Sequence, residues 1–153
     1  MDSAEHGFRQ ALHLARGRGD VRAALIFLHN LVRLQVAAGR PDGARASALE
    51  SHALLGGVGE DVLKFELIEV GAGIASVLGE HETAARFWGA ATQRYADAGY
   101  RRPAEDQAQL ERLSTASRLS LGDAAFVSAE AAGRVLDIDT AMRELGEWLR
   151  RDP

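Results

Sequence analysis

LQVAAGRPDGARASAL at Leu34–Leu49 and IASVLGEHETAARFWG at Ile74–Gly89 are two stretches, offset by 40 residues, that decide the predicted fold. Each stretch reads as the end of one helix, a glycine turn, and a second helix that opens with small residues. In this register Gly39 aligns with Gly79, Ala44 with Ala84, Ala48 with Trp88 and, upstream, Leu28 with Ile68. A helix-pair unit of roughly 34 to 45 residues is typical of a helical solenoid. The pattern therefore predicts an all-α fold of stacked helix pairs.

The same helical spacing of apolar residues recurs along the rest of the chain, and glycine-containing turns divide it into segments of helical length. Gly99, like the two repeat glycines, follows a helical run, where a left-handed residue often ends a helix. Asp20 and Asp137 stand where an N-cap is expected. We therefore predict eight helices: 3–16, 21–38, 42–55, 60–78, 81–98, 104–119, 122–132 and 138–150.

Close packing explains the residues of the repeat. Small residues such as Ala44 and Ala84 let the second helix of a pair approach the first, and larger residues fill the groove between pairs. One pair cannot bury its apolar faces alone, so pairs stack. Segments 21–38 and 60–78 are apolar around much of their circumference, so we expect each to lie between neighbours on both sides.

The repeat resembles tetratricopeptide (TPR) units, although its period of 40 residues exceeds the usual length of about 34 and the usual Gly-Tyr pair is absent. The resemblance implies a right-handed, TPR-like solenoid of about four antiparallel helix pairs, forming one domain over residues 1–153. A compact helical bundle without repeats is the alternative.

A more specific resemblance begins at HETAARFWGAATQRYADA, His81–Ala98. It resembles the A-A-R-L-x-G-A-A segment that closes the TPR-like region of bacterial STAND-type signalling ATPases, among them LuxR-type, maltose-activator-like, adenylate-cyclase-like and SARP-type transcriptional regulators. The matching residues are Ala84, Ala85, Arg86, Gly89, Ala90, Ala91 and Gly99. Downstream, Leu121–Phe126 resembles the family's L-G-x-x-x-F, and Gly133–Asp137 resembles its G-R-x-L-S. Trp88 stands where the family usually has leucine.

The resemblance implies a protein-interaction or effector-sensing domain of a transcriptional or signalling regulator. Such domains accompany an NTPase module and an output module. The chain contains no G-x-x-x-x-G-K-[ST] motif, so we expect a fragment of a larger regulator or a stand-alone adaptor, and not an enzyme. The alternative is a structural oligomerisation or spacer module, in which the terminal helices 3–16 and 138–150 self-associate.

Composition narrows the class of protein further. The net charge of -4 and pI of about 5.7 do not suit a nucleic-acid-binding surface. Cysteine is absent, which excludes disulfides and thiolate metal sites. The N-terminus has no signal-peptide pattern, and the longest charge-free apolar stretch, Val70–Gly79, is too short to span a membrane. We expect a cytoplasmic protein that contacts neither membrane nor nucleic acid directly. Its expected partners are a protein, a peptide or neighbouring domains, and a homodimer is an open alternative.

Several residue types suggest chemistry but have simpler structural explanations. No two of the five histidines are spaced i, i+4, so no metal site is expected, and no cofactor either. Gly71-Ala72-Gly73 lacks the third glycine of a dinucleotide loop and is better explained by close helix packing. Glu66 and Glu69 lie one helical turn apart, as acid–base pairs can, but a solvated or groove-lining face explains them better. Arg101 and Arg102 are expected in a solvated turn.

The concave groove of the predicted stack is the best-supported candidate site. Aligning Leu28 with Ile68 places polar residues of two adjacent helices side by side. Polar residues on apolar helices cost stability unless they are exposed or paired. The candidate ligand-binding residues are His29, Asn30, Arg33, Glu66 and Glu69. The alternative is that they pair with one another across the helices, for example Arg33 with Glu69.

Overall fold

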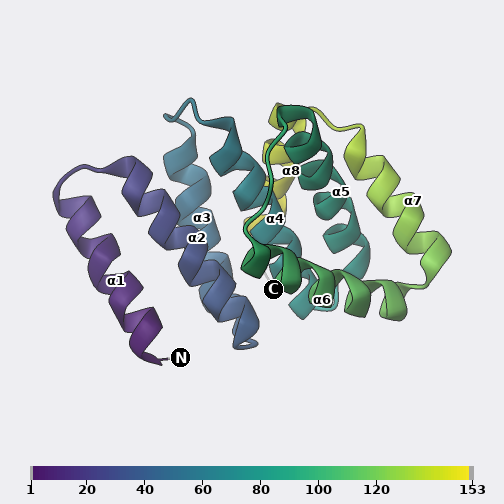
Figure 1. Cartoon of the computed structure of the whole chain (residues 1–153), viewed down its shortest axis with the longest axis horizontal. Coiled ribbons are helices and arrows are strands. Elements are labelled where there is room, and N and C mark those ends of the chain that lie inside the picture. The colour runs from purple at the N-terminus through teal and green to yellow at the C-terminus, as the bar shows by residue number, and fades with distance from the viewer. Residues whose placement is uncertain (1, 152–153) are drawn as a thin grey trace.

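The structure is a computed structural model that describes residues 2–151, so Met1, Asp152 and Pro153 of the predicted domain lie outside the described residues. Within that range the chain forms eight helices and no strand (Figure 1). They are α1 (Asp2–Gly17), α2 (Val21–Ala37), α3 (Pro41–Leu55), α4 (Asp61–Val77), α5 (His81–Ala98), α6 (Ala104–Leu121), α7 (Asp123–Arg134) and α8 (Ile138–Leu149). The all-α prediction is confirmed, and no predicted helix end differs by more than two residues from the observed one.

Local capping explains where these helices begin and end. The Asp20 side chain accepts a hydrogen bond from the Ala23 amide at 3.0 Å, and Asp137 accepts one from the Thr140 amide at 2.7 Å, so both predicted N-caps are present. Gly99 follows α5 with φ of +67°, a left-handed conformation that glycine adopts at little cost.

The first five helices lie side by side in chain order (Figure 1). α2 packs on α1 and α3, and α4 packs on α2, α3 and α5. As expected from its sequence, α4 is buried on nearly all sides: every residue from Leu67 to Ser76 is buried. A helix that is apolar all round has no face to offer water, so it takes the central position.

The last three helices depart from the expected succession of pairs. α5 packs extensively on α7, whereas α6 and α7 share little contact. α6 crosses in front of α4 and α5, and α8 lies behind them, against α3, α4 and α5 (Figure 1). α5 packs on α7 because their backbones touch at Gly89 and Gly133, which leaves no room for α6 between them.

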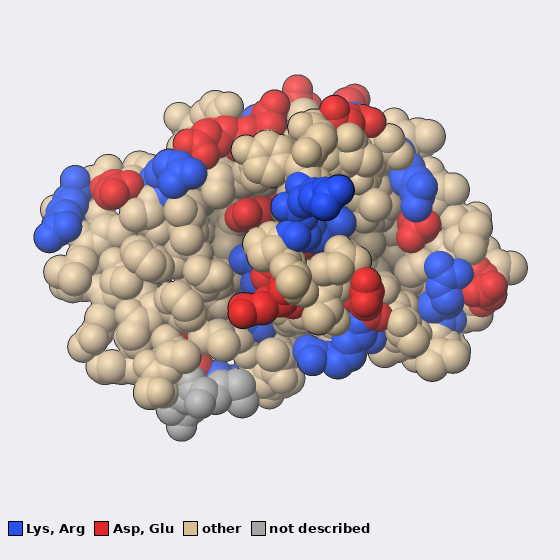
Figure 2. Space-filling view, in the orientation of Figure 1, with Lys and Arg blue, Asp and Glu red and all other residues tan. Residues whose placement is uncertain are grey.

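The surface carries both signs of charge. Figure 2 shows basic and acidic side chains interspersed on the face that bears α6, without a broad field of one sign. Several ion pairs join different helices, for example Arg86 of α5 with Glu144 of α8 at 2.8 Å. Among the described helices, none combines the length and apolar character needed to cross a membrane.

Candidate functional site

A groove of about 700 Å³ runs between α2 and α4. The turn after α5 and the start of α6 close one end of it. Apolar and charged side chains alternate along its walls. Its lining residues are Arg22, Ile26, Asn30 and Arg33 of α2, Glu60 to Leu63, Phe65 and Glu66 at α4, and Ala98, Tyr100 and Asp106 beyond them.

The predicted site residues divide into two groups. Asn30, Arg33 and Glu66 line the groove, so the repeat register brought together three of the five. His29 and Glu69 do not line it: the side chain of His29 has no exposed surface, and that of Glu69 is 8% exposed. His29 is therefore not positioned to meet a ligand, whereas Glu69 lines a smaller cavity beneath α6.

His29 ties three helices together. Its Nδ1 lies 3.0 Å from a Glu66 carboxylate oxygen on α4, and its Nε2 lies 2.8 Å from the Ser51 hydroxyl on α3. A neutral imidazole with the proton on Nδ1 satisfies both contacts, because Nδ1–H donates to Glu66 and the Ser51 hydroxyl donates to Nε2. One carboxylate oxygen of Glu66 is therefore bound to a core histidine, while the side chain stays 28% exposed in the groove.

Burial fixes the protonation of this network. Desolvation lowers the pKa of His29, and the nearby positive charge of Arg33 lowers it further. The Glu66 carboxylate favours the charged imidazole and raises the pKa, but this effect is smaller than the desolvation. For Glu66, burial raises the pKa, but the hydrogen bond from His29 and the nearby positive charges give a net lowering. The network thus combines a neutral histidine with an ionised glutamate at neutral pH.

The serine–histidine–carboxylate arrangement has the connectivity of a hydrolase triad. A nucleophile must, however, reach its substrate, and both Ser51 and His29 have no exposed surface. The network therefore acts as a buried structural tie in this structure.

We predict that His29 makes stability fall in mild acid. Because its folded-state pKa lies below the unfolded value of about 6.5, the unfolded chain binds more protons, and stability is lost as pH falls below about 6.5, by at most about 1.4 kcal/mol per pH unit. His29→Gln should flatten this decline between pH 7 and 5. Urea denaturation at several pH values measures it. His13→Gln, at an exposed position, should keep the wild-type slope, and an unchanged slope in His29→Gln would contradict the assignment.

The sequence offered an Arg33–Glu69 pair as an alternative, but the structure does not contain this pair. Its nearest acidic partner is Asp106 of α6, with Nε 3.4 Å from Oδ1, longer than the 2.7–2.9 Å typical of a charge-assisted hydrogen bond. The Arg33 side chain is 17% exposed and lines the groove. A largely desolvated guanidinium with a distant partner is well suited to bind an acceptor group more closely.

Glu69 instead pairs with Arg102, and the expectation of a solvated turn at Arg102 was wrong. The side chains of Arg102 and Glu69 are only 12% and 8% exposed. The Arg102 guanidinium also lies over the Tyr95 ring, 4.5 Å from its centroid, and donates to Thr92. Burial raises the pKa of Glu69, and Arg102 opposes that shift. The sequence carried no local signal for this pair, because its geometry depends on the path of the turn after α5.

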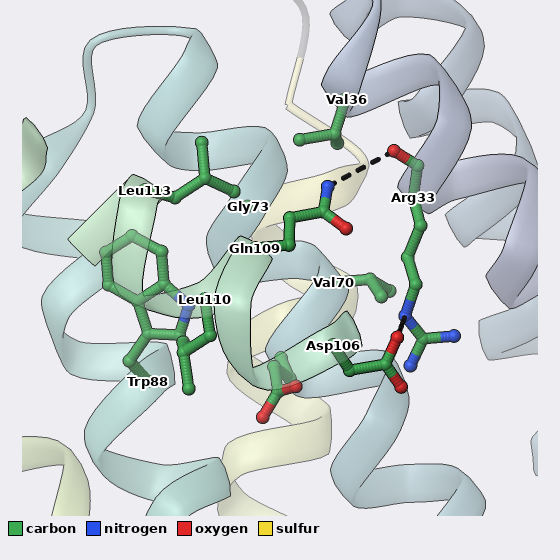
Figure 3. A pocket seen from close by; sticks show the side chains of 10 residues that line it. Arg33, Val36, Val70, Gly73, Trp88, Asp106, Gln109, Leu110 and Leu113 are labelled. Carbon is green, nitrogen blue, oxygen red and sulfur yellow. Dashed lines mark hydrogen bonds and ion pairs between the residues drawn. The ribbon is translucent and has the colours of Figure 1, made fainter. Parts of the chain in front are cut away.

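A second, much smaller cavity of about 30 Å³ lies under α6 (Figure 3). Arg33 and Asp106 line both this cavity and the groove, so the two adjoin at this ion pair. The inner walls are apolar, and Figure 3 shows Trp88 and Leu110 on one side of it and Val36 and Val70 on the other. In the described part of the chain, no three histidine, aspartate or glutamate side chains are placed to hold a metal ion together.

Compared with known proteins, the chain matches no family model, no curated protein and no solved structure significantly.

Proposed function

We propose that this chain is a TPR-like interaction or effector-sensing domain of a bacterial regulator, which binds a peptide segment in the groove between α2 and α4. The pairs α2–α3 and α4–α5, stacked through α2, α3 and α4, support the TPR-like part of this proposal. The STAND-type regulator assignment rests on the sequence resemblance alone.

The observation that carries the proposal is the mixed lining of the groove. Ile26 and Phe65 offer apolar contact, while Arg33, Asn30 and Glu66 offer one cation, one amide and one anion within the same depression. Binding sites typically combine apolar area with a few fixed polar groups that set orientation. Glu66 is itself held in place by buried His29, which keeps the polar group rigid.

Selection from a random peptide library displayed on phage tests this proposal. We expect the wild-type chain to enrich a peptide class whose binding to Arg33→Gln is about ten- to hundredfold weaker, as for loss of a hydrogen bond to a charged group. Isothermal titration with the enriched peptide measures the loss. Arg143→Gln, at an exposed position of α8, is the matched control and should bind as the wild type does.

A spacer or oligomerisation module is the second candidate. In this candidate the outer helix α1, with Leu14 59% exposed, would form the contact between copies. This candidate predicts no enriched peptide, together with a molar mass that rises with concentration in light scattering. In the peptide-selection experiment, equal binding of an enriched peptide to the wild type and to Arg33→Gln would show that the peptide does not bind in the groove between α2 and α4.

A further inference from the structure

α6 packs across α4 and α5 and lies in front of them in Figure 1. Its inward stripe is Asp106, Leu110, Leu113 and Ser117, spaced by four, three and four residues, which places all four on one helical face. Only Ser117 among the residues of α6 is buried. The helix therefore contacts the rest of the molecule through a narrow strip, and most of its surface faces away.

Each position of the stripe meets a group of matching chemistry. Asp106 faces the Arg33 guanidinium, and the neighbouring Gln109 amide donates to the Arg33 carbonyl at 3.3 Å (Figure 3). Leu110 and Leu113 line the small cavity over α4, and Leu113 approaches Gly73 closely enough that an added Cβ there would lie 3.5 Å away.

The far end of α6 is held by hydroxyl groups. The Ser117 Oγ lies 2.8 Å from the Ser76 Oγ of α4 and 2.9 Å from Nδ1 of His81 at the start of α5. At the near end, the Arg102–Glu69 ion pair holds the turn that leads into α6. The attachment thus combines polar contacts near both ends with Leu110, Leu113 and Leu121, which pack against the core.

The fit of α6 is looser than that of its neighbours. A cavity of about 30 Å³ remains beneath it, and the Asp106–Arg33 approach of 3.4 Å is long for an ion pair with hydrogen bonding. α7, in contrast, meets α5 through direct backbone contact at Gly133. α7 therefore has an anchor on α5 that does not involve α6.

We propose that the face of α2, α4 and α5 beneath α6 is a binding site for an amphipathic helix and that α6 occupies this site in cis. The partner is a helix that carries an acidic residue at the position of Asp106, apolar residues at those of Leu110 and Leu113, and a small hydroxyl residue at that of Ser117. The proposal rests on the proposed function, because this face adjoins the groove at Arg33. A partner helix replaces α6 and contacts the same apolar residues beneath it, Val36, Val70 and Trp88.

Hydrogen exchange followed by mass spectrometry tests whether α6 opens locally. We expect amides of residues 104–121 to exchange at least tenfold faster than those of α5 and α7, and Ser117→Ala to speed the exchange of 104–121 several-fold further without affecting α7. Ser120→Ala, at an exposed position of the same helix, is the matched control and should change nothing. Exchange of α6 at the same rate as α5 and α7 would overturn the proposal.

A peptide in trans tests the binding site itself. A fluorescent peptide of residues 104–121, acetylated and amidated, should bind Ser117→Ala saturably in an anisotropy titration, and at least tenfold more tightly than the same peptide with Leu110→Ser and Leu113→Ser. Equal binding of the two peptides, or none, overturns the helix-docking proposal. That result leaves the proposed function standing on its own test, because the phage-selected peptide and Arg33→Gln report on the open groove between α2 and α4.

Discussion

Gly133→Ala is expected to lower the free energy of unfolding by about 3 kcal/mol or more, as overpacking against an unyielding neighbour does. A Cβ at this position would lie 1.8 Å from the Arg86 carbonyl oxygen and 3.0 Å from the Ala90 amide nitrogen. These are backbone atoms of α5, so no side chain can turn aside, and α7 must move away as a whole. Urea denaturation followed by circular dichroism measures the change.

Gly7→Ala is the control for this prediction. Gly7 lies in α1 with no heavy atom within 4 Å of an added Cβ, so alanine should stabilise the chain by about 0.5–1 kcal/mol through helix propensity. Gly133, like Gly7, does not have a positive φ, so its cost would come from packing alone. Equal stabilities of wild type and Gly133→Ala would show that α5 and α7 are farther apart than described.

The same interface gives a physical account of the residues that carry the family resemblance. A Cβ at Gly89 would lie 2.1 Å from the Glu130 carbonyl oxygen, which mirrors the contact at Gly133. Ala85 and Ala90 beside it are fully buried. The small-residue pattern of α5 thus serves close helix packing. Membership of the regulator family itself stays a prediction.

The helices could be predicted because their signals are local. Apolar spacing and turn glycines act within a few residues, and Gly39, Gly79 and Gly99 all adopt the left-handed conformation after a helix. The order in which the helices pack after α5 could not be predicted. An amphipathic stripe indicates that a helix face is buried, but it does not indicate which helix covers that face. The contact of Gly89 with α7 joins residues far apart in sequence.

The candidate site shows the same division. Asn30, Arg33 and Glu66 were found because the repeat register places α2 beside α4. Asp106 and Arg102 were missed as partners, because they come from α6 and the turn before it, which follow no repeat. The repeat register predicted His29 in the groove, but its ring lies in the core, where it is hydrogen-bonded to Ser51 of α3.

Trp148→Ala should be the most destabilising single change in α8, with an expected loss of about 3–5 kcal/mol in the free energy of unfolding. The side chain is 2% exposed and meets the Phe87 ring edge-to-face at 5.7 Å between centroids. Its Nε1 donates to Glu80 at 2.8 Å, and the Arg45 guanidinium lies 5.2 Å from its ring centroid. Urea denaturation measures the loss.

Trp148→Phe separates the ring from the hydrogen bond. Phenylalanine keeps aromatic contact with Phe87 and loses the donor to Glu80, so the expected loss is smaller, about 1–2 kcal/mol. The comparison bears on α4, because α8 covers it through Leu145, which packs on Gly71. A loss below about 1 kcal/mol in Trp148→Ala would be less than a buried tryptophan should cost, and would mean that α8 is loosely docked. A loss of about 3–5 kcal/mol in Trp148→Ala would mean that α8 is part of the core, because undocking α8 would expose the central helix α4 to water.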